Sequence, residues 1–217
     1  MLASRIETVD HHTGGEPFRI LAEPPVAIPG ATVAERRARA IEDPDVQALR
    51  AVLCSEPRGH ADVYGGLIVP PDDAEAHLGV LFRHEGGLST ACGHGTIVLG
   101  VWAVDTGLVA APETGSDTAG QVHQRNVAVF ADGEVDRSPC GSGTCARLAV
   151  LHADGGLPAG TVLRHDSIVG STFTGTVLDT VGADGRRAVL PQVTGMAYRT
   201  GEHVFPIDPL VPGVVLR

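Results

Sequence analysis

The stretch Cys92-Gly93-His94-Gly95-Thr96 returns later in the chain, with one change, as Cys140-Gly141-Ser142-Gly143-Thr144. Each stretch leads into a mostly apolar run, which predicts buried helices from Gly93 to about Val104 and from Thr144 to about Ala153. A thiol at a helix N-terminus meets unpaired backbone N–H groups and the positive end of the helix dipole, which favours the thiolate. Two such thiols, presented by two similar half-structures, suit a reaction in which one removes a proton and the other supplies one.

We therefore predict that Cys92 and Cys140 are catalytic acid/base thiols; the alternative is that each is a small buried apolar residue. His94 is predicted to pair with a thiolate or to bind a substrate carboxylate, unless it only caps the helix start or is solvated. Asp136 is predicted to bind a substrate ammonium group, unless it only forms a turn. Backbone N–H groups after each cysteine can hold a carboxylate. The predicted substrate-binding residues are Gly93, His94, Asp136, Gly141, Ser142, Gly143 and Thr144.

The other two cysteines, Cys54 and Cys145, fall at the end of one predicted helix and inside another, which is typical of packing residues. No Cys-x-x-Cys pair occurs, so the sequence predicts no metal site. A zinc or redox protein that uses Cys92, His94, Cys140 and Cys145 stays an alternative.

Composition places the chain among globular proteins: of 217 residues, 43% are hydrophobic and 19% are charged. The formal net charge is −10 without a Lys/Arg cluster, so neither nucleic acid nor an anionic membrane is an expected partner. The first residues are not followed by an apolar signal segment, and no apolar stretch approaches about 18 residues. We expect a cytoplasmic protein with free thiols.

Strand and turn signals indicate an α+β fold in which a curved antiparallel or mixed sheet wraps a single helix. Strands are expected within residues 5–22, 61–70, 79–84, 126–131, 161–163, 167–179, 187–190, 193–198 and 203–207. A helical segment is expected over residues 32–54, broken near Pro44. The linker-like residues 111–121 predict two domains, residues 1–115 with the Cys92 motif and residues 116–217 with the Cys140 motif.

Several longer segments carry a resemblance to a known family. They are Asp10–Pro17, Glu56–His60, Ala91–Ile97, Asn126–Gly133, Asp136–Thr144, Ser167–Ser171 and Thr194–Tyr198. On these segments the chain resembles the proline racemase family, which includes 4-hydroxyproline 2-epimerases and trans-3-hydroxyproline dehydratases.

The resemblance implies a diaminopimelate-epimerase-like fold: two pseudo-symmetric halves, each with a sheet around a central helix and with the site between them. It implies no metal, no pyridoxal phosphate and no other cofactor. One cysteine removes the α-proton of an imino acid and the other protonates the opposite face, and the match places these roles on Cys92 and Cys140. Dehydratase members carry Thr where this chain has Cys140, so two cysteines favour a proline racemase or hydroxyproline 2-epimerase.

The chain departs from this family in length. About 100 residues, the size of a small domain, are expected to be missing, and the join is expected within residues 111–121. Three hypotheses follow: an active racemase or epimerase, a catalytically degenerate member that only binds an imino acid or has no activity, and the zinc or redox protein. The sequence does not choose among proline, 4-hydroxyproline and 3-hydroxyproline, and the shortened halves suggest a homodimer.

Overall fold

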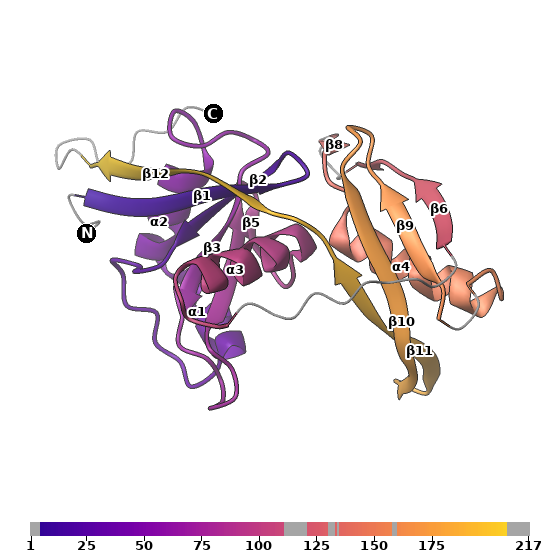
Figure 1. The fold of residues 1–217 in the computed structure, drawn as a ribbon. Coiled ribbons are helices and arrows are strands. Elements are labelled where there is room, and N and C mark those ends of the chain that lie inside the picture. The colour runs from indigo at the N-terminus through magenta and orange to yellow at the C-terminus, as the bar shows by residue number, and fades with distance from the viewer. Residues whose placement is uncertain (1–4, 111–120, 130–132, 134, 158–159, 208–217) are drawn as a thin grey trace. The chain divides into compact units, whose positions relative to one another are not determined.

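The structure, a computed structural model, describes residues 5–110, 121–129, 133, 135–157 and 160–207 (Figure 1). The chain forms two compact units that interleave along the sequence. Unit 1 contains residues 1–12, 17–95 and 198–217, and unit 2 contains residues 13–16 and 96–197. The predicted domain boundary between residues 115 and 116 lies outside the described residues. The mixed α+β class predicted from the sequence is confirmed.

Unit 1 is built on a six-stranded mixed sheet with the order β12-β1-β2-β3-β4-β5. Its strands are β1 (Arg5–Thr13), β2 (Glu16–Leu21), β3 (Tyr64–Val69), β4 (Gly79–His84), β5 (Gly87–Ser89) and β12 (Tyr198–Pro206). Strands β2 and β3 pair in parallel, whereas β3–β4, β4–β5 and β1–β12 are antiparallel. The last described strand thus returns to pair with the first and forms one edge of this sheet.

Two helices, α1 (Val33–Glu42) and α2 (Pro44–Cys54), cover the core of unit 1. The predicted break at Pro44 is confirmed. Asp43 caps α2 by accepting the amide hydrogens of Asp45 and Val46, and proline fits the first helical position because it lacks an amide hydrogen. The apolar side of α2 packs into the core, which contains Val46, Leu49, Leu53, Leu21, Leu67 and Leu81, each at most 1% exposed.

Unit 2 is built on a four-stranded mixed sheet with the order β11-β10-β9-β6. Its strands are β6 (Gln121–Arg125), β9 (Val162–Asp166), β10 (Thr172–Ala183) and β11 (Arg186–Thr194); the short strands β7 (Ala128–Val129) and β8 (Val135–Asp136) form a separate pair. Strands β6 and β9 are parallel, and the other pairs are antiparallel. Helix α4 (Gly141–Ala153) packs on the sheet through Leu148 and Leu151, against Leu163.

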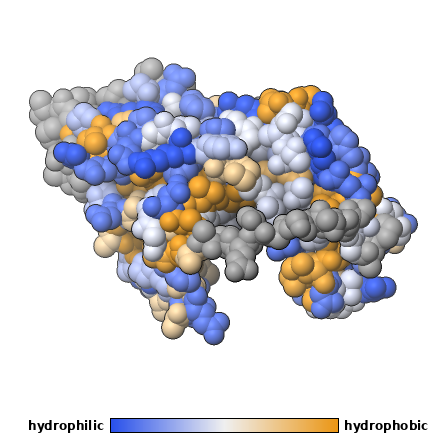
Figure 2. Space-filling view, viewed as in Figure 1, coloured by the Kyte–Doolittle hydropathy of each residue, from blue (hydrophilic) through white to orange (hydrophobic). Residues whose placement is uncertain are grey.

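The β10–β11 hairpin extends beyond this core. It turns at Asp184 and Gly185, which both have positive φ, as the predicted Asp-Gly turn requires. Its outer part leaves Leu178, Val181 and Leu190 between 43% and 59% exposed. Figure 2 shows this apolar surface at the lower right.

Helix α3 (Gly93–Asp105) has no polar face, and the sequence predicts that it is buried all round. The structure corrects this in part: Val98, Leu99 and Ala103 are buried, whereas Val101 and Trp102 are half-buried, because the packed elements do not enclose its whole circumference. Within the described residues, no helix is both long enough and apolar enough to cross a membrane.

Candidate active site

In unit 1, Cys92 lies directly before α3 and is 7% exposed. Its Sγ atom lies 3.6 Å from both ring nitrogens of His94, so either nitrogen can donate a hydrogen to a thiolate there. The imidazole ring is itself buried and contacts Phe18 and Tyr64 edge-on, at centroid distances of 5.9 and 5.3 Å. A Cβ atom on Gly95 would lie 2.2 Å from the Phe18 ring, which explains the second glycine of this motif.

In unit 2, Cys140 is the N-cap residue of α4, and this helix begins three residues earlier than predicted. Its Sγ atom accepts the amide hydrogen of Gly143 and contacts Oγ of Ser142, both at 3.4 Å. A Cβ atom on Gly143 would lie 3.3 Å from this sulfur, so glycine permits the close approach. Cys140 has φ 65° and ψ 114°, a backbone conformation that L-residues rarely adopt and that surrounding contacts must hold.

The loop before Cys140 is held by its own side chains. Asp136 is 1% exposed, and its Oδ1 accepts the amide hydrogen of Ser138 at 2.8 Å. The hydroxyl group of Ser138 in turn accepts the amide hydrogen of Cys140 at 3.1 Å. Asp136 therefore forms a turn in this structure, which was the alternative to its role as a ligand for a substrate ammonium group.

Thr144 joins the cysteine to the sheet of unit 2. Its hydroxyl group donates to the carbonyl oxygen of Cys140 at 2.8 Å and lies 2.9 Å from Nδ1 of His165. Because the hydroxyl group has one hydrogen, Nδ1 must be the donor in the second contact. Burial lowers the pKa of His165, and the positive charge of Arg147 lowers it further, so the ring is neutral at pH 7.

The neighbouring residue Asp166 anchors the end of β9. Its buried carboxylate accepts hydrogen bonds from Thr172 at 2.7 Å and from Arg164 at 3.1 Å, and it lies 2.6 Å from Nε2 of His123. The hydrogen bond from Thr172, with those from His123 and Arg164, holds the pKa of Asp166 well below its usual range. A carboxylate bound in this way serves the structure of this end of the sheet.

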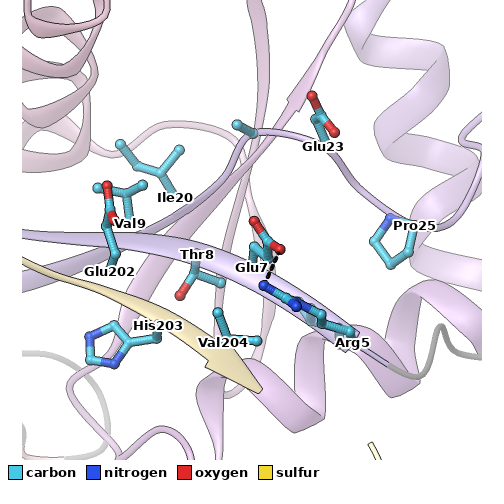
Figure 3. A pocket seen from close by; sticks show the side chains of 12 residues that line it. Arg5, Glu7, Thr8, Val9, Ile20, Glu23, Pro25, Glu202, His203 and Val204 are labelled. Atoms are coloured by element: carbon cyan, nitrogen blue, oxygen red, sulfur yellow. Dashed lines mark ion pairs between the residues drawn. The ribbon is translucent and has the colours of Figure 1, made fainter. Parts of the chain in front are cut away.

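Each unit also has a groove on its surface. The larger, about 520 Å³, lies along β1 and β12 of unit 1 and is lined by ionisable side chains such as Glu7, Glu23, Glu202 and His203 (Figure 3). No predicted site residue lines it. A groove of about 480 Å³ in unit 2 is lined by Gly143 together with Asn126, Arg147 and His165, and therefore borders the first turn of α4.

The structure brings the predicted site residues together in two groups. Cys92, Gly93 and His94 lie at the start of α3 in unit 1. In unit 2, Asp136 ends β8, and Cys140, Gly141, Ser142, Gly143 and Thr144 lie at the start of α4. Four residues that support the Cys140 loop were not predicted as site residues. The contacts of Glu16, His165 and Ser171 join distant segments, whereas Ser138 acts locally within the loop. In the part of the chain that the structure describes, no group of three or more His, Cys, Asp or Glu side chains could hold a metal ion.

Comparison with known proteins gives a family match over most of the chain. A family model described as proline racemase matches residues 8–119 and again residues 114–213. The two matches meet at residues 114–119, inside the linker-like segment where the sequence predicts a join. Similar proteins include a trans-3-hydroxy-L-proline dehydratase of Bacillus thuringiensis, 30% identical with 93% of this chain and 94% of the relative covered. A 3-hydroxyproline 2-epimerase of Burkholderia multivorans is also 30% identical, with 100% and 99% covered.

The alignment to the Bacillus protein spans 317 positions, so at least 100 of them have no residue in this chain of 217. Among solved structures, a hydroxyproline epimerase from Agrobacterium vitis with bound trans-4-hydroxy-L-proline matches with a TM-score of 0.80 at 20% identity, covering 98% of this chain and 96% of the other. A probable proline racemase from Agrobacterium radiobacter matches with a TM-score of 0.79 at 21% identity, with 97% and 96% covered. These similarities confirm the predicted fold despite the missing positions.

Proposed function

Because the chain belongs to the proline racemase family, we propose that it inverts the α-carbon of proline or a hydroxyproline by proton transfer between two cysteines, without a cofactor. The observation that carries this proposal is the environment of Cys140. Its sulfur caps α4 and accepts the Gly143 amide hydrogen, so it meets the donors and the dipole that favour a thiolate.

In the proposed reaction, one thiolate removes the α-proton, and the electron pair of the broken C–H bond spreads into the substrate carboxylate. The other cysteine, as a thiol, gives its proton to the opposite face of the same carbon. The substrate is thereby inverted, and the two sulfurs have exchanged protonation states. The reverse reaction then starts from the other thiolate, so each cysteine serves one enantiomer.

The groups around each thiol suit this chemistry. Backbone N–H groups at Gly93 and at Gly141–Thr144 are proposed to bind the substrate carboxylate, where negative charge develops. His94, 3.6 Å from the Cys92 sulfur, is proposed to stabilise that thiolate or to contact the carboxylate. Asp136 is proposed to contact the imino group, beyond the turn that it already forms.

Dehydration of trans-3-hydroxy-L-proline is the second candidate, because similar proteins carry that name. It shares the first step, after which a general acid protonates the 3-hydroxyl group, water leaves, and the electron pair at C2 forms a C2–C3 double bond. The enamine formed in this way tautomerises to a cyclic imine. Cys140 favours epimerisation over dehydration, since dehydratase members resemble this chain but carry Thr at that position.

The test is proton NMR in D2O with L-proline, trans-4-hydroxy-L-proline and trans-3-hydroxy-L-proline in separate samples. We expect the α-proton signal to disappear and the C2 epimer to form from at least one substrate. Formation of a cyclic imine from the 3-hydroxy substrate alone would replace the proposal with dehydration. No exchange with any substrate, in folded protein with reduced cysteines, would instead support a degenerate member.

The homodimer expected from the sequence stays a prediction, which light scattering tests.

A further inference from the structure

The loop that carries Cys140 is fixed at almost every backbone polar group, by contacts within unit 2. The amide hydrogen of Arg137 is donated to Glu16, and the carbonyl oxygen of Arg137 accepts from Ser171. The amide hydrogen of Ser138 is donated to Asp136, and that of Cys140 to Ser138. The carbonyl oxygen of Pro139 accepts from Asn126, and that of Cys140 from Thr144. These contacts hold the positive φ of Cys140 and so determine where its sulfur lies.

Glu16 supplies the first of these contacts. It is 1% exposed, and its Oε2 accepts the amide hydrogen of Arg137 at 3.1 Å and lies 3.4 Å from Nε of the same residue. A glutamate this buried is rare unless it is paired. Both contacts join Glu16 to a loop 121 residues later in the chain.

The turn that carries Glu16 is shaped to fit this loop. Gly14 has φ +63°, and a Cβ atom there would lie 2.3 Å from Oγ of Ser171 and 3.2 Å from Cα of Ser138. A Cβ atom on Gly15 would lie 3.6 Å from Arg137. The turn therefore packs directly on the segment before Cys140, and its backbone geometry places Glu16 beside Arg137.

We propose that Glu16 is a positioning residue for Cys140: its ionised carboxylate holds Arg137 and thereby fixes the loop that presents the thiol. This inference rests on the proposed function, in which Cys140 is an acid/base group. Glu16 itself touches no reacting atom in this account. It acts through Arg137. The ionised carboxylate holds Arg137 more firmly than a protonated one, because a hydrogen bond to a charged acceptor is about twice as strong as one to a neutral acceptor.

The hold of Glu16 on Arg137 depends on pH, because the buried carboxyl group ionises near neutral pH. Among the described residues, the charged groups that act on it are Arg137 and Asp136. Burial raises the pKa of Glu16 to about 7, opposed by the backbone hydrogen bond from Arg137 and increased by the negative charge of Asp136. The carboxyl group of Glu16 therefore changes its charge near pH 7.

The experiment compares the wild type with Glu16→Gln, which keeps a neutral acceptor for the Arg137 amide. The ratio of their α-proton exchange rates, wild type over variant, is measured from pH 5.5 to 8.5, so that the ionisations of the thiols and of the substrate cancel. We expect a ratio near 1 at low pH that rises to about 10 above the pKa of Glu16, carried by kcat rather than KM. Glu16→Asp keeps the charge, so the ratio of its exchange rate to that of Glu16→Gln should also rise with pH, by a smaller factor.

Glu42→Gln is the matched control, because Glu42 is exposed at the end of α1, and its ratio should stay near 1 at every pH. A second readout needs no catalysis: the rate at which iodoacetamide alkylates Cys140, measured by mass spectrometry, should give the same rise in the wild-type to Glu16→Gln ratio. A flat ratio in that readout overturns the role of Glu16. A rising alkylation ratio without any substrate exchange keeps the role of Glu16 and rejects only the proposed function.

Discussion

Nδ1 of His165 lies 2.9 Å from Oγ1 of Thr144, and this one contact ties the sheet of unit 2 to the helix start that carries Cys140. Both side chains are buried, at 2% and 0% exposure. The hydroxyl group passes the connection on to the carbonyl oxygen of Cys140. The position of the thiol thus depends on a hydrogen-bond relay that starts on β9.

The first prediction concerns this relay. Thr144→Val keeps the shape of the side chain and removes its hydroxyl group, which leaves Nδ1 of His165 and the Cys140 carbonyl without that partner. We expect a loss of about 2 kcal/mol in the free energy of unfolding, measured by urea denaturation. Thr180→Val, at an exposed position of β10, should change it by less than about 0.5 kcal/mol. Equal effects in the two variants would contradict the relay.

The second prediction follows from the raised pKa of Glu16. A carboxyl group whose pKa rises from 4.5 to about 7 on folding favours the folded state when it is protonated. This stabilisation is fully present below pH 4.5 and is lost as the pH rises through about 7. The melting temperature of the wild type, minus that of Glu16→Gln, should therefore fall between these pH values. An unchanged difference would show that Glu16 keeps its ordinary pKa.

The third prediction separates backbone strain from steric fit in the turn. Gly14 and Gly185 both have positive φ, but a Cβ atom meets Ser171 at Gly14 and nothing within 4 Å at Gly185. Gly185→Ala should cost about 1 kcal/mol from the backbone alone. Gly14→Ala should cost about 2–4 kcal/mol, because the loop must also move. Similar losses in both variants, measured by denaturant unfolding, would mean that the turn does not pack on the Cys140 loop.

Local features of the fold were predictable from the sequence. The break at Pro44, the helix after Cys92 and the Asp-Gly hairpin turn at Asp184 depend on neighbouring residues and on backbone geometry, which the sequence displays directly. The strand at 167–179 was predicted too early, because Ser167–Ser171 forms a turn closed by hydrogen bonds between the two serines. Strand β6 was not predicted, since its side chains give no apolar run.

The site was predictable only in part, because the sequence shows local motifs but not contacts between distant residues. The two cysteine motifs repeat, so they are visible without the structure. The support of Cys140 comes instead from Glu16, at a separation of 121 residues, and from His165, at 21 residues beyond Thr144. Such contacts follow from how strands pair across the sheet and from which turn packs on which loop, and no sequence period records them.

The most direct test of the central claim is the α-proton exchange of a single substrate in D2O, in both configurations at C2, for Cys92→Ser, Cys140→Ser and Cys145→Ser. Cys145 lies on the same helix as Cys140 but five residues farther along, so it is a matched control. We expect each of the first two variants to lose inversion by at least about 100-fold, while the third retains it. Wild-type inversion in either Cys92→Ser or Cys140→Ser would contradict a reaction that needs both thiols.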